Sequence, residues 1–336
     1  MIAVSVVVPT YNRCEVLQRT VRCLLEQTFA AEQYEVIVVD DQSTDDTWQW
    51  LQEAQAHDRP LIAVRNPKKG RGQARNAGLS AARGEIVCFV DDDVWVVPGF
   101  VQAHWEAHQR AGERAVVIGG LGHCPETKDT IANAYEDARL VRVEKRIQDA
   151  GEQLDAGFFR TGNVSAQRRF LTEIGGFSEA FQGYSYEDSE LGYRLKAHGG
   201  RFVYAPQAAG VHFTEISIAA ILRKSTEAGR SAVTFLRLWP EAAGPVPAPY
   251  AIPGIPATAR HDSLLKRVNK AVLFSAPARA VMHGLLTGAM ALGHRDASFR
   301  LLGALSYSYY SSAFRLAAKG TTELGTPVHT QVSTDT

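Results

Sequence analysis

The sequence predicts an α/β fold: a Rossmann-like, mostly parallel sheet flanked by helices, followed by a helical C-terminal region. Short β-branched runs at residues 4–8 and 35–39 are typical of strands that are buried on both faces. Segments with helical spacing of apolar residues alternate with these runs. That alternation favours parallel pairing, since each helix returns the chain to the same end of the sheet.

The first 97 residues supply four expected strands and three expected helices in alternation. Residues 43–46 offer N-capping side chains for the second helix. In chain order the strands are 4–8, 35–39, 61–64 and 85–90, and the helices are 14–28, about 43–51 and 72–82.

After Pro98 the order of elements becomes less regular. We expect, in order, a helix at 99–110, a strand at 115–119, a polar helix at 128–149, a strand at 161–165, a helical turn at 168–174, a helix at 186–198 and a strand at 201–204.

The remaining chain divides by composition. Residues 216–239 are a helical extension, and 240–258 form a Pro-rich linker, with six prolines between Pro240 and Pro256. Residues 259–320 are helical in pattern and basic, with nine Lys or Arg against two Asp, and 321–336 form a polar tail that we expect to be disordered. The basic region could cap the core, form a homodimer contact or make a peripheral contact with an anionic membrane; the first two are favoured.

Composition excludes several classes of protein. Lys plus Arg and Asp plus Glu both number 36, so a general nucleic-acid binder is not expected. The four cysteines lie far apart, and the N-terminus lacks the features of a signal peptide. The least polar long stretch, 271–293, contains Pro277, Arg279 and His283, so no membrane span is expected. We expect a cytoplasmic protein, with the inner face of the cell membrane as an alternative location.

Three adjacent acids, Asp91, Asp92 and Asp93, follow a strand that is expected to be buried. Ligands of open α/β sheets bind at the carboxyl ends of strands. Mutual repulsion of these carboxylates would be offset by Mn²⁺ or Mg²⁺, which accept oxygen ligands. Alternation along a strand would point Asp91 and Asp93 the same way and Asp92 elsewhere. The alternative is a solvated acidic turn.

Two other strand ends carry polar residues toward the same edge. Asp40 and Asp41 follow the second strand, and an aspartate there could accept a hydrogen bond from a nucleobase. The first strand ends in Pro9, Thr10, Tyr11, Asn12 and Arg13, of which Tyr11 could stack on a base. The alternative is that Asp40 and Asp41 only cap a helix.

A loop rich in glycine and arginine spans residues 70–78. Its glycines permit close approach, and a helix N-terminus with Arg71 and Arg75 favours an anion such as a diphosphate. No Gly-Lys-Ser/Thr follows, so this is not a P-loop.

Glu187 and Asp188 open a helix, where the dipole stabilises carboxylates, and an ionised carboxylate there can act as a general base. Glu190 and Arg194 have the spacing of a surface salt bridge. His212 is expected to follow a strand. A histidine at this position could have a structural role or could be a ligand.

Together these segments resemble family 2 glycosyltransferases of the GT-A fold. The resemblance runs from about residue 3 to 215 and rests on VVVPTYN at 6–12, VVDDQSTD at 38–45, ARNAG at 74–78, DDD at 91–93 and ED at 187–188. It implies a GT-A catalytic domain over 1–215, with a nucleotide-sugar half at about 1–97 and an acceptor half at about 98–215.

The resemblance also implies the roles of residues. Asp93 would hold the metal, with His212 as a further ligand, and Asp188 would be the base, with Glu187 beside it. The donor, most simply a UDP-sugar, would contact Pro9, Thr10, Tyr11, Asn12, Arg13, Asp40, Asp41, Arg71 or Arg75, Asp91 and Asp92.

The implied reaction is metal-dependent, inverting transfer of a sugar to the hydroxyl of a carbohydrate, lipid-linked or small-molecule acceptor. The Gln-x-x-Arg-Trp motif of processive synthases is missing, so non-processive transfer in cell-surface polysaccharide, glycolipid or secondary-metabolite synthesis is expected. Two alternatives stay open: a sugar nucleotidyltransferase, which should carry a Gly-rich loop with Lys after the first strand, and an inactive nucleotide-binding module.

Overall fold

A computed structural model describes residues 1–57, 60–151, 154–181, 183–243 and 274–319. The chain forms two compact units, Met1–Ile221 and Leu222–Thr336. The first unit carries every residue that the sequence singles out for chemistry.

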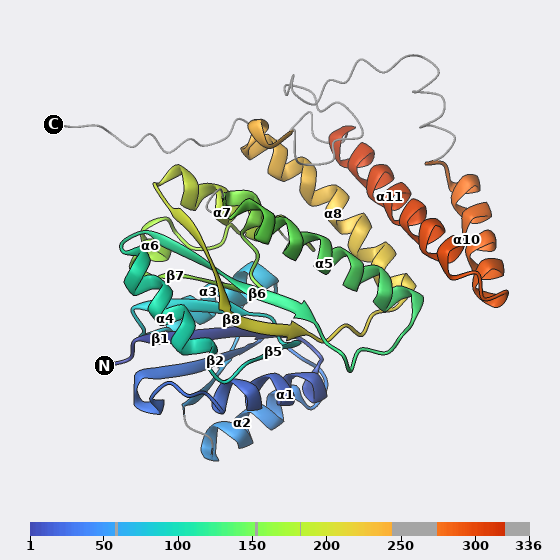
Figure 1. Cartoon of the computed structure of the whole chain (residues 1–336). Helices are drawn as coiled ribbons and strands as arrows, with labels where there is room; N and C mark the ends of the chain where they lie inside the picture. Colours follow the sequence, from blue (N-terminus) through green and yellow to red (C-terminus); the bar gives the residue numbers. More distant parts are fainter. Residues whose placement is uncertain (58–59, 152–153, 182, 244–273, 320–336) are drawn as a thin grey trace. The chain divides into compact units, whose positions relative to one another are not determined.

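The first unit is built on one eight-stranded sheet (Figure 1) with the order β3-β2-β1-β4-β7-β6-β8-β5. Neighbours among β1 to β4 are parallel, as are β6 and β8, whereas β7 is antiparallel to both neighbours and β5 is antiparallel to β8. The α/β prediction is confirmed, and the sheet is mixed. The strands are β1 (Val4–Thr10), β2 (Tyr34–Asp40), β3 (Leu61–Arg65), β4 (Ile86–Val90), β5 (Val94–Val96), β6 (Ala115–His123), β7 (Asn163–Gln167) and β8 (Arg201–His212).

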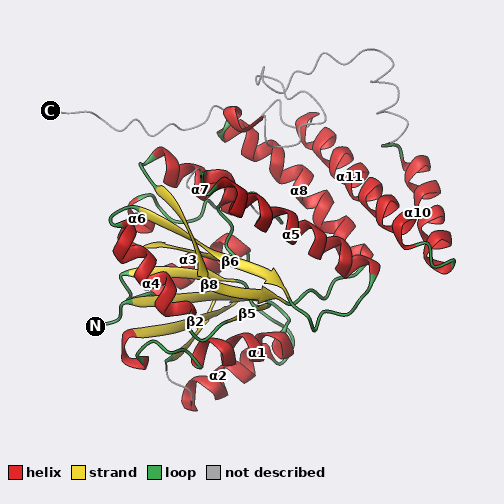
Figure 2. Cartoon of the chain, viewed as in Figure 1, coloured by secondary structure: helices red, strands yellow, loops and turns green. Residues whose placement is uncertain are grey.

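Helices cover both faces of this sheet (Figure 2). One core cluster joins Val4, Val6 and Val8 of β1 to α1, α2 and α4, and the other joins Val7 to α3, α5, α6 and α7. The strands are apolar at successive positions because both faces are buried. The helices are α1 (Cys14–Leu25), α2 (Thr47–His57), α3 (Arg71–Ala81), α4 (Phe100–Ala111), α5 (Ile131–Ala150), α6 (Arg168–Glu173) and α7 (Glu187–Ala197).

Strands β6 and β8 extend well beyond the predicted ranges. Their register shifts between Gly119, opposite Ala205, and Gly120, opposite Ala209, so residues 206–208 bulge from β8. The Asn163 amide donates to the carbonyl oxygens of Gly120 at 2.9 Å and Ala208 at 2.8 Å and holds this bulge. Glycines and Pro206 in these stretches weaken the strand pattern, which is why the extensions were not predicted. Beyond the bulge, His123 pairs with His212.

The second unit is helical where it is described. Helix α8 (Ile218–Leu238) enters it from the first unit, and α10 (Ala276–Ala291) and α11 (Arg295–Lys319) are separated by a turn at Gly293, whose φ is +70°. A Cβ on Gly229 would lie 2.2 Å from the Tyr310 carbonyl oxygen, so only glycine permits this approach of α8 to α11. Residues 244–273, which hold most of the expected linker, and the expected tail lie outside the described residues. No helix in the described ranges is long and apolar enough to cross a membrane.

Candidate functional site

The ends of β1 and β2 are tied together by Asn12. Its φ is +52°, a left-handed conformation that asparagine tolerates. The Asn12 amide donates to Ser43 Oγ at 2.9 Å, and the Thr44 amide donates to Asn12 Oδ1 at 2.7 Å. The preceding Tyr11 is 41% exposed, and Lys69 Nζ lies 4.2 Å from its ring centroid. An aromatic face and a cation are therefore presented at this edge, in the first unit.

Asp40 and Asp41 hold the loops that follow β2. Asp40 has no exposed surface, and its carboxylate accepts from the Ser43 amide and contacts Arg65 Nε at 3.4 Å. Asp41 accepts from Asn66 Nδ2 at 2.6 Å and from the Gly70 amide at 2.9 Å. Both carboxylates thus bind the chain itself, and Asp41 fixes the start of the loop at residues 70–78.

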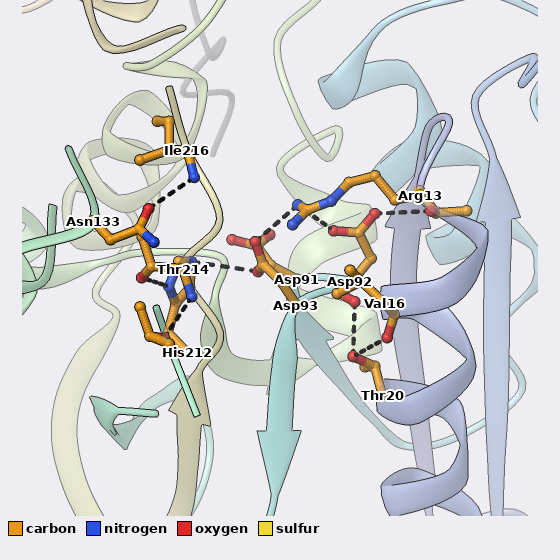
Figure 3. A network of polar contacts seen from close by, with 12 residues as sticks. Arg13, Val16, Thr20, Asp91, Asp92, Asp93, Asn133, His212, Thr214 and Ile216 are labelled. Atoms are coloured by element: carbon orange, nitrogen blue, oxygen red, sulfur yellow. Dashed lines mark hydrogen bonds and ion pairs between the residues drawn. The ribbon is translucent and has the colours of Figure 1, made fainter. Parts of the chain in front are cut away.

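Asp91, Asp92 and Asp93 form a turn, because β4 ends at Val90 and β5 begins at Val94. The predicted strand alternation was therefore wrong for these three residues. Arg13 Nη1 donates to Asp92 Oδ1 at 3.0 Å and Asp93 Oδ2 at 2.8 Å (Figure 3). Asp92 also accepts from Thr10 Oγ1 at 2.8 Å. Residues of β1 and of this turn meet as predicted, with an arginine between the two carboxylates.

Charges in this group shift one another's pKa values. Burial opposes the charge of Arg13, but Asp93 and Asp92 outweigh it and raise the Arg13 pKa. Burial raises the pKa of Asp92 to about 6; Arg13 opposes this shift and the Asp93 carboxylate adds to it. A second positive charge would therefore be bound favourably here.

His212 faces the same turn from the end of β8 (Figure 3), with Nε2 3.4 Å from Asp93 Oδ1. Its Nδ1 lies 3.0 Å from Thr214 Oγ1, and that hydroxyl donates to Asp137 Oδ1 at 2.7 Å. Because the hydroxyl gives its hydrogen to Asp137, it accepts one from Nδ1–H. With a divalent ion bound between them, the imidazole would direct its Nε2 lone pair toward the side of Asp93.

Two acceptors that face each other in this way suit a shared cation. Carboxylate oxygen and imidazole nitrogen are both ligands of Mn²⁺, and an oriented imidazole is typical of metal sites. Within the described ranges, no three His, Cys, Asp or Glu side chains gather as a metal-binding group. Asp93 and His212 thus fit a divalent ion whose remaining ligands come from a bound substrate and water.

Arg75 bridges the acidic turn to helix α7. Its Nη2 lies 3.1 Å from Asp91 Oδ1 and its Nη1 3.1 Å from Glu187 Oε1, and its side chain is only 3% exposed. Burial opposes its charge, but Asp91 and Glu187 raise the Arg75 pKa. We predicted Arg75 as an anion contact of the loop at 70–78; in this structure two carboxylates already occupy it. Arg71 is exposed.

Glu187 and Asp188 open α7, as predicted. Ser185 and Tyr186 have φ values of +76° and +71°, which are strained for residues other than glycine and often mark functional sites. Burial, then the adjacent Glu187 carboxylate, raises the pKa of Asp188 to about 6, and Arg75 opposes this shift. A carboxylate with a raised pKa at a helix N-terminus can take a proton from a substrate hydroxyl.

Glu190 and Arg194 on the same helix form the predicted ion pair, at 2.7 Å, but Glu190 is buried rather than on the surface. Arg194 also donates to the carbonyl oxygens of Ile174 and Gly176, both at 2.6 Å. The pair therefore attaches α7 to the loop after α6.

Sequence patterns indicated most residues of the site but not how they are connected. The Arg75 bridge needs Asp91 and Glu187 to approach across the sheet, and the Asp137–Thr214–His212 chain joins α5 to the end of β8. Among Arg75, Asp137 and Thr214, only Arg75 was indicated by the sequence, because it lies in the glycine- and arginine-rich loop at residues 70–78. Nothing local distinguishes Thr214 or Asp137 from other polar residues.

A mixed α/β sheet with an acidic turn at the end of β4 and a histidine at the end of β8 defines a GT-A glycosyltransferase architecture. A model of glycosyl transferase family 2 matches residues 5–175, and the chain belongs to this family. A second model, the N-terminal domain of galactosyltransferase, matches residues 142–216, which include Asp188 and His212.

Among curated proteins the chain is similar to the validoxylamine A glucosyltransferase of Streptomyces hygroscopicus subsp. jinggangensis, at 32% identity over 229 residues, 62% of this chain and 54% of the relative. It is also 38% identical over 181 residues to the GalNAc(5)-diNAcBac-PP-undecaprenol beta-1,3-glucosyltransferase of Campylobacter jejuni, covering 53% of this chain and 56% of that one. The chain spans about half the length of these curated relatives.

Two solved structures show the same fold. The mannosyltransferase PcManGT from Pyrobaculum calidifontis, in complex with GDP-Man and Mn²⁺, has a TM-score of 0.58 at 22% identity, covering 92% of this chain and 86% of that one. TarS residues 1–349 from S. aureus, in complex with UDP-GlcNAc, has a TM-score of 0.53 at 16% identity, covering 95% and 92%.

Proposed function

We propose that this protein transfers a sugar from a nucleoside-diphosphate sugar to the hydroxyl of an acceptor, with a divalent metal and inversion at the anomeric carbon. The observation that carries this proposal is the meeting of Asp93 and His212, whose facing acceptor atoms suit a cation. Mn²⁺ or Mg²⁺ held there would neutralise charge on the leaving diphosphate. That PcManGT was solved with GDP-Man and Mn²⁺ supports this choice of ligands.

The donor nucleoside is assigned to the edge formed by β1 and β2. Tyr11 offers an exposed ring for stacking, next to Lys69, and Pro9 and Thr10 lie at the end of β1. Asp40 and Asp41 act by holding the loops that shape this edge. Asp91, half-exposed beside Gly162, would contact the ribose or sugar. UDP is the first nucleotide to test, and TarS was solved with UDP-GlcNAc.

Asp188 is assigned as the general base and Glu187 as its positioning neighbour. Asp188 is partly exposed at the start of α7, whereas Glu187 is fixed by Arg75. Asp188 would take the proton of the acceptor hydroxyl as that oxygen attacks the anomeric carbon and the nucleoside diphosphate leaves. A single displacement of this kind inverts the configuration, and NMR of the anomeric proton of the product tests that outcome.

Incubation with Mn²⁺ and a panel of nucleotide sugars tests the function, with released nucleoside diphosphate as the readout. We expect slow release with one donor, loss of release on chelation, and loss of metal-dependent donor binding in Asp93→Ala. Asp149→Ala, an exposed acid of α5, is the control. In a parallel incubation with a nucleoside triphosphate and a sugar 1-phosphate, formation of a nucleotide sugar with release of pyrophosphate would favour a nucleotidyltransferase. Silence across the panel together with intact nucleotide binding would favour an inactive module.

We also propose that the basic helices beyond residue 259 serve either as a homodimer contact or as a peripheral contact with the inner face of the membrane. Their described part carries Arg279, Arg295, Arg300, Arg315 and Lys319 against Asp296. Basic helices bind anionic lipid at low salt. Sedimentation with anionic vesicles, beside the measured mass in solution, separates these two roles. Cell-surface polysaccharide, glycolipid and secondary-metabolite synthesis are the settings proposed.

A further inference from the structure

The short end of β8, residues 209–212, carries the proposed metal ligand. These residues pair with β6 on one side and with β5 on the other, and Val94, the first residue of β5, lies opposite His212. The Phe213 amide donates to the Asp93 carbonyl oxygen at 2.8 Å. Because β5 follows Asp93 directly, the placement of this end of β8 decides where His212 lies relative to Asp93 (Figure 3).

This end of β8 is held at the point where its register with β6 shifts. The side-chain nitrogen of Asn163 donates to a carbonyl oxygen on each strand, that of Gly120 in β6 and that of Ala208 in β8. A Cβ on Gly119 would lie 2.3 Å from both polar atoms of the Asn163 amide, so a larger residue there would displace it. One buried side chain thus bridges β6 and β8 just before the stretch that ends at His212.

His104 of α4 fixes which way the amide of Asn163 points. Its Nε2 lies 2.9 Å from Asn163 Oδ1. Because the amide nitrogen donates to the two strands, Oδ1 accepts, and His104 Nε2 carries the hydrogen. Burial lowers the pKa of His104 to about 4, so the ring is neutral near neutral pH and its other nitrogen, Nδ1, is an acceptor. A rotated amide would turn Oδ1 toward the two carbonyl oxygens and lose the hydrogen bonds on both sides.

The ring of His104 is held in turn by Ser165 and His108. Ser165 Oγ lies 2.8 Å from His104 Nδ1 and donates to it, so the same hydroxyl accepts from His108 Nε2, also at 2.8 Å. All four side chains are buried. Each hydrogen bond from His108 through Ser165 and His104 to Asn163 therefore has one direction, and the series is called here the His104 chain. Buried polar series of this kind specify a single arrangement of the groups they join.

We propose that His104 and Asn163 are positioning residues for the metal site: they hold the bulge that sets His212 beside Asp93, and so determine the affinity for the divalent ion. This inference rests on the proposed function, because it takes His212 as a metal ligand. It deepens that function, since metal affinity would depend on side chains buried between α4 and β7 as well as on the ligands themselves.

Substitutions of His104 separate positioning from stability. In His104→Gln the side-chain nitrogen can take the place of Nε2 and donate to Asn163, whereas the shorter side chain of His104→Asn can replace only the contact with Ser165. The matched control is Ser165→Ala, which breaks the His104 chain but removes no contact of Asn163. We expect denaturant unfolding to show a loss of stability in both His104→Asn and Ser165→Ala.

Calorimetric titration with Mn²⁺, on the full chain with excess UDP, measures positioning. Residues that orient metal ligands typically contribute about 10- to 100-fold to metal affinity, so His104→Asn should weaken Mn²⁺ binding by at least about tenfold. His104→Gln and Ser165→Ala should stay much closer to the wild type. Unchanged affinity in His104→Asn, or an equal loss in Ser165→Ala, would overturn the proposal and leave the proposed function standing. A wild type that binds no Mn²⁺ would overturn the proposed metal dependence, and this inference with it.

Hydrogen exchange provides a readout without any metal. The Phe213 amide, which donates to Asp93, reports how firmly the end of β8 is held at the acidic turn. We expect peptides that contain Phe213 to exchange faster in His104→Asn than in Ser165→Ala, with the exchange of β1 the same in both. Equal exchange at Phe213 in the two variants would mean that the His104 chain serves stability alone, against the proposal.

Discussion

Two arginines neutralise carboxylates at the same edge of the sheet, in very different surroundings. Arg13 bridges Asp92 and Asp93 with a side chain that is 33% exposed. Arg75 bridges Asp91 and Glu187 with a side chain that is 3% exposed. The two bridges contact adjacent residues of one turn, so their difference lies in access to water.

That difference assigns them opposite roles. A partly exposed guanidinium can leave its carboxylates when a ligand arrives, so we propose that Arg13 is a counter-ion that a divalent metal replaces. Removing one partner of a buried pair leaves an uncompensated charge, at about 3 to 5 kcal/mol. Arg75 is therefore a permanent brace between the acidic turn and α7. Each prediction below tests one side of this comparison.

The largest effect is expected for Asp188, which follows Glu187, the residue that Arg75 holds in place. Asp188→Asn removes the proposed base, and base catalysis is typically worth about 10² to 10⁴-fold, so turnover should fall by at least two orders of magnitude with donor affinity largely retained. Steady-state kinetics and donor titration measure both quantities, with Asp149→Asn as the control. Unchanged turnover would remove Asp188 from the mechanism.

Arg75→Gln tests the brace itself. We expect the free energy of unfolding to fall by about 3 to 5 kcal/mol, because Glu187 is left buried without a counter-charge. Denaturant unfolding measures the loss, and the double variant Arg75→Gln/Glu187→Gln should recover part of it. Equal losses in the single and double variants would mean that the ion pair is not the source of stability.

The raised pKa of Asp188 predicts a pH dependence. The carboxylate is active when deprotonated and its pKa is raised to about 6, so activity should rise with pH through about 6 and fall about tenfold per unit below it. The rate of transfer at saturating donor, measured from pH 5 to 8, checks this. A midpoint near 4, the ordinary value for aspartate, would contradict the assigned environment.

The smallest effect is expected for Arg13→Gln. Removing a competing positive charge should tighten Mn²⁺ binding severalfold, while the unfolding free energy changes by less than in Arg75→Gln. Calorimetric titration with Mn²⁺ and denaturant unfolding give the two numbers. A large drop in donor affinity instead would make Arg13 a donor contact, and a loss of stability equal to that of Arg75→Gln would abolish the distinction between the two bridges.

The parallel half of the fold was the easiest part to predict, because strands such as Val4–Thr10 are buried on both faces and are rich in valine. Beyond Pro98 the signal weakens. Strand β5 has three residues, and β8 is interrupted by Pro206 and the bulge. Local patterns placed His212 after a strand but could not show that this strand ends beside Asp93.

Candidate site residues could be chosen from where strands end, but their hydrogen-bond and ion-pair partners could not. Strand alternation could not predict the orientations of Asp91 to Asp93, since a turn follows Val90. The partners of Arg75 are 16 and 112 positions away in sequence, and no pattern in a single sequence records contacts of that separation.

The bulge in β8 limits which changes in chain length are compatible with the present position of His212. Adjacent positions along a strand face opposite sides of a sheet. If one of residues 206–208 were deleted, either the bulge would shrink or Phe213 would move into the place of His212 and the imidazole would turn away from Asp93. The Asn163 contacts to Gly120 and Ala208 oppose shrinkage. Where the bulge is kept, the loss of one residue in this stretch would thus separate His212, the proposed metal ligand, from Asp93.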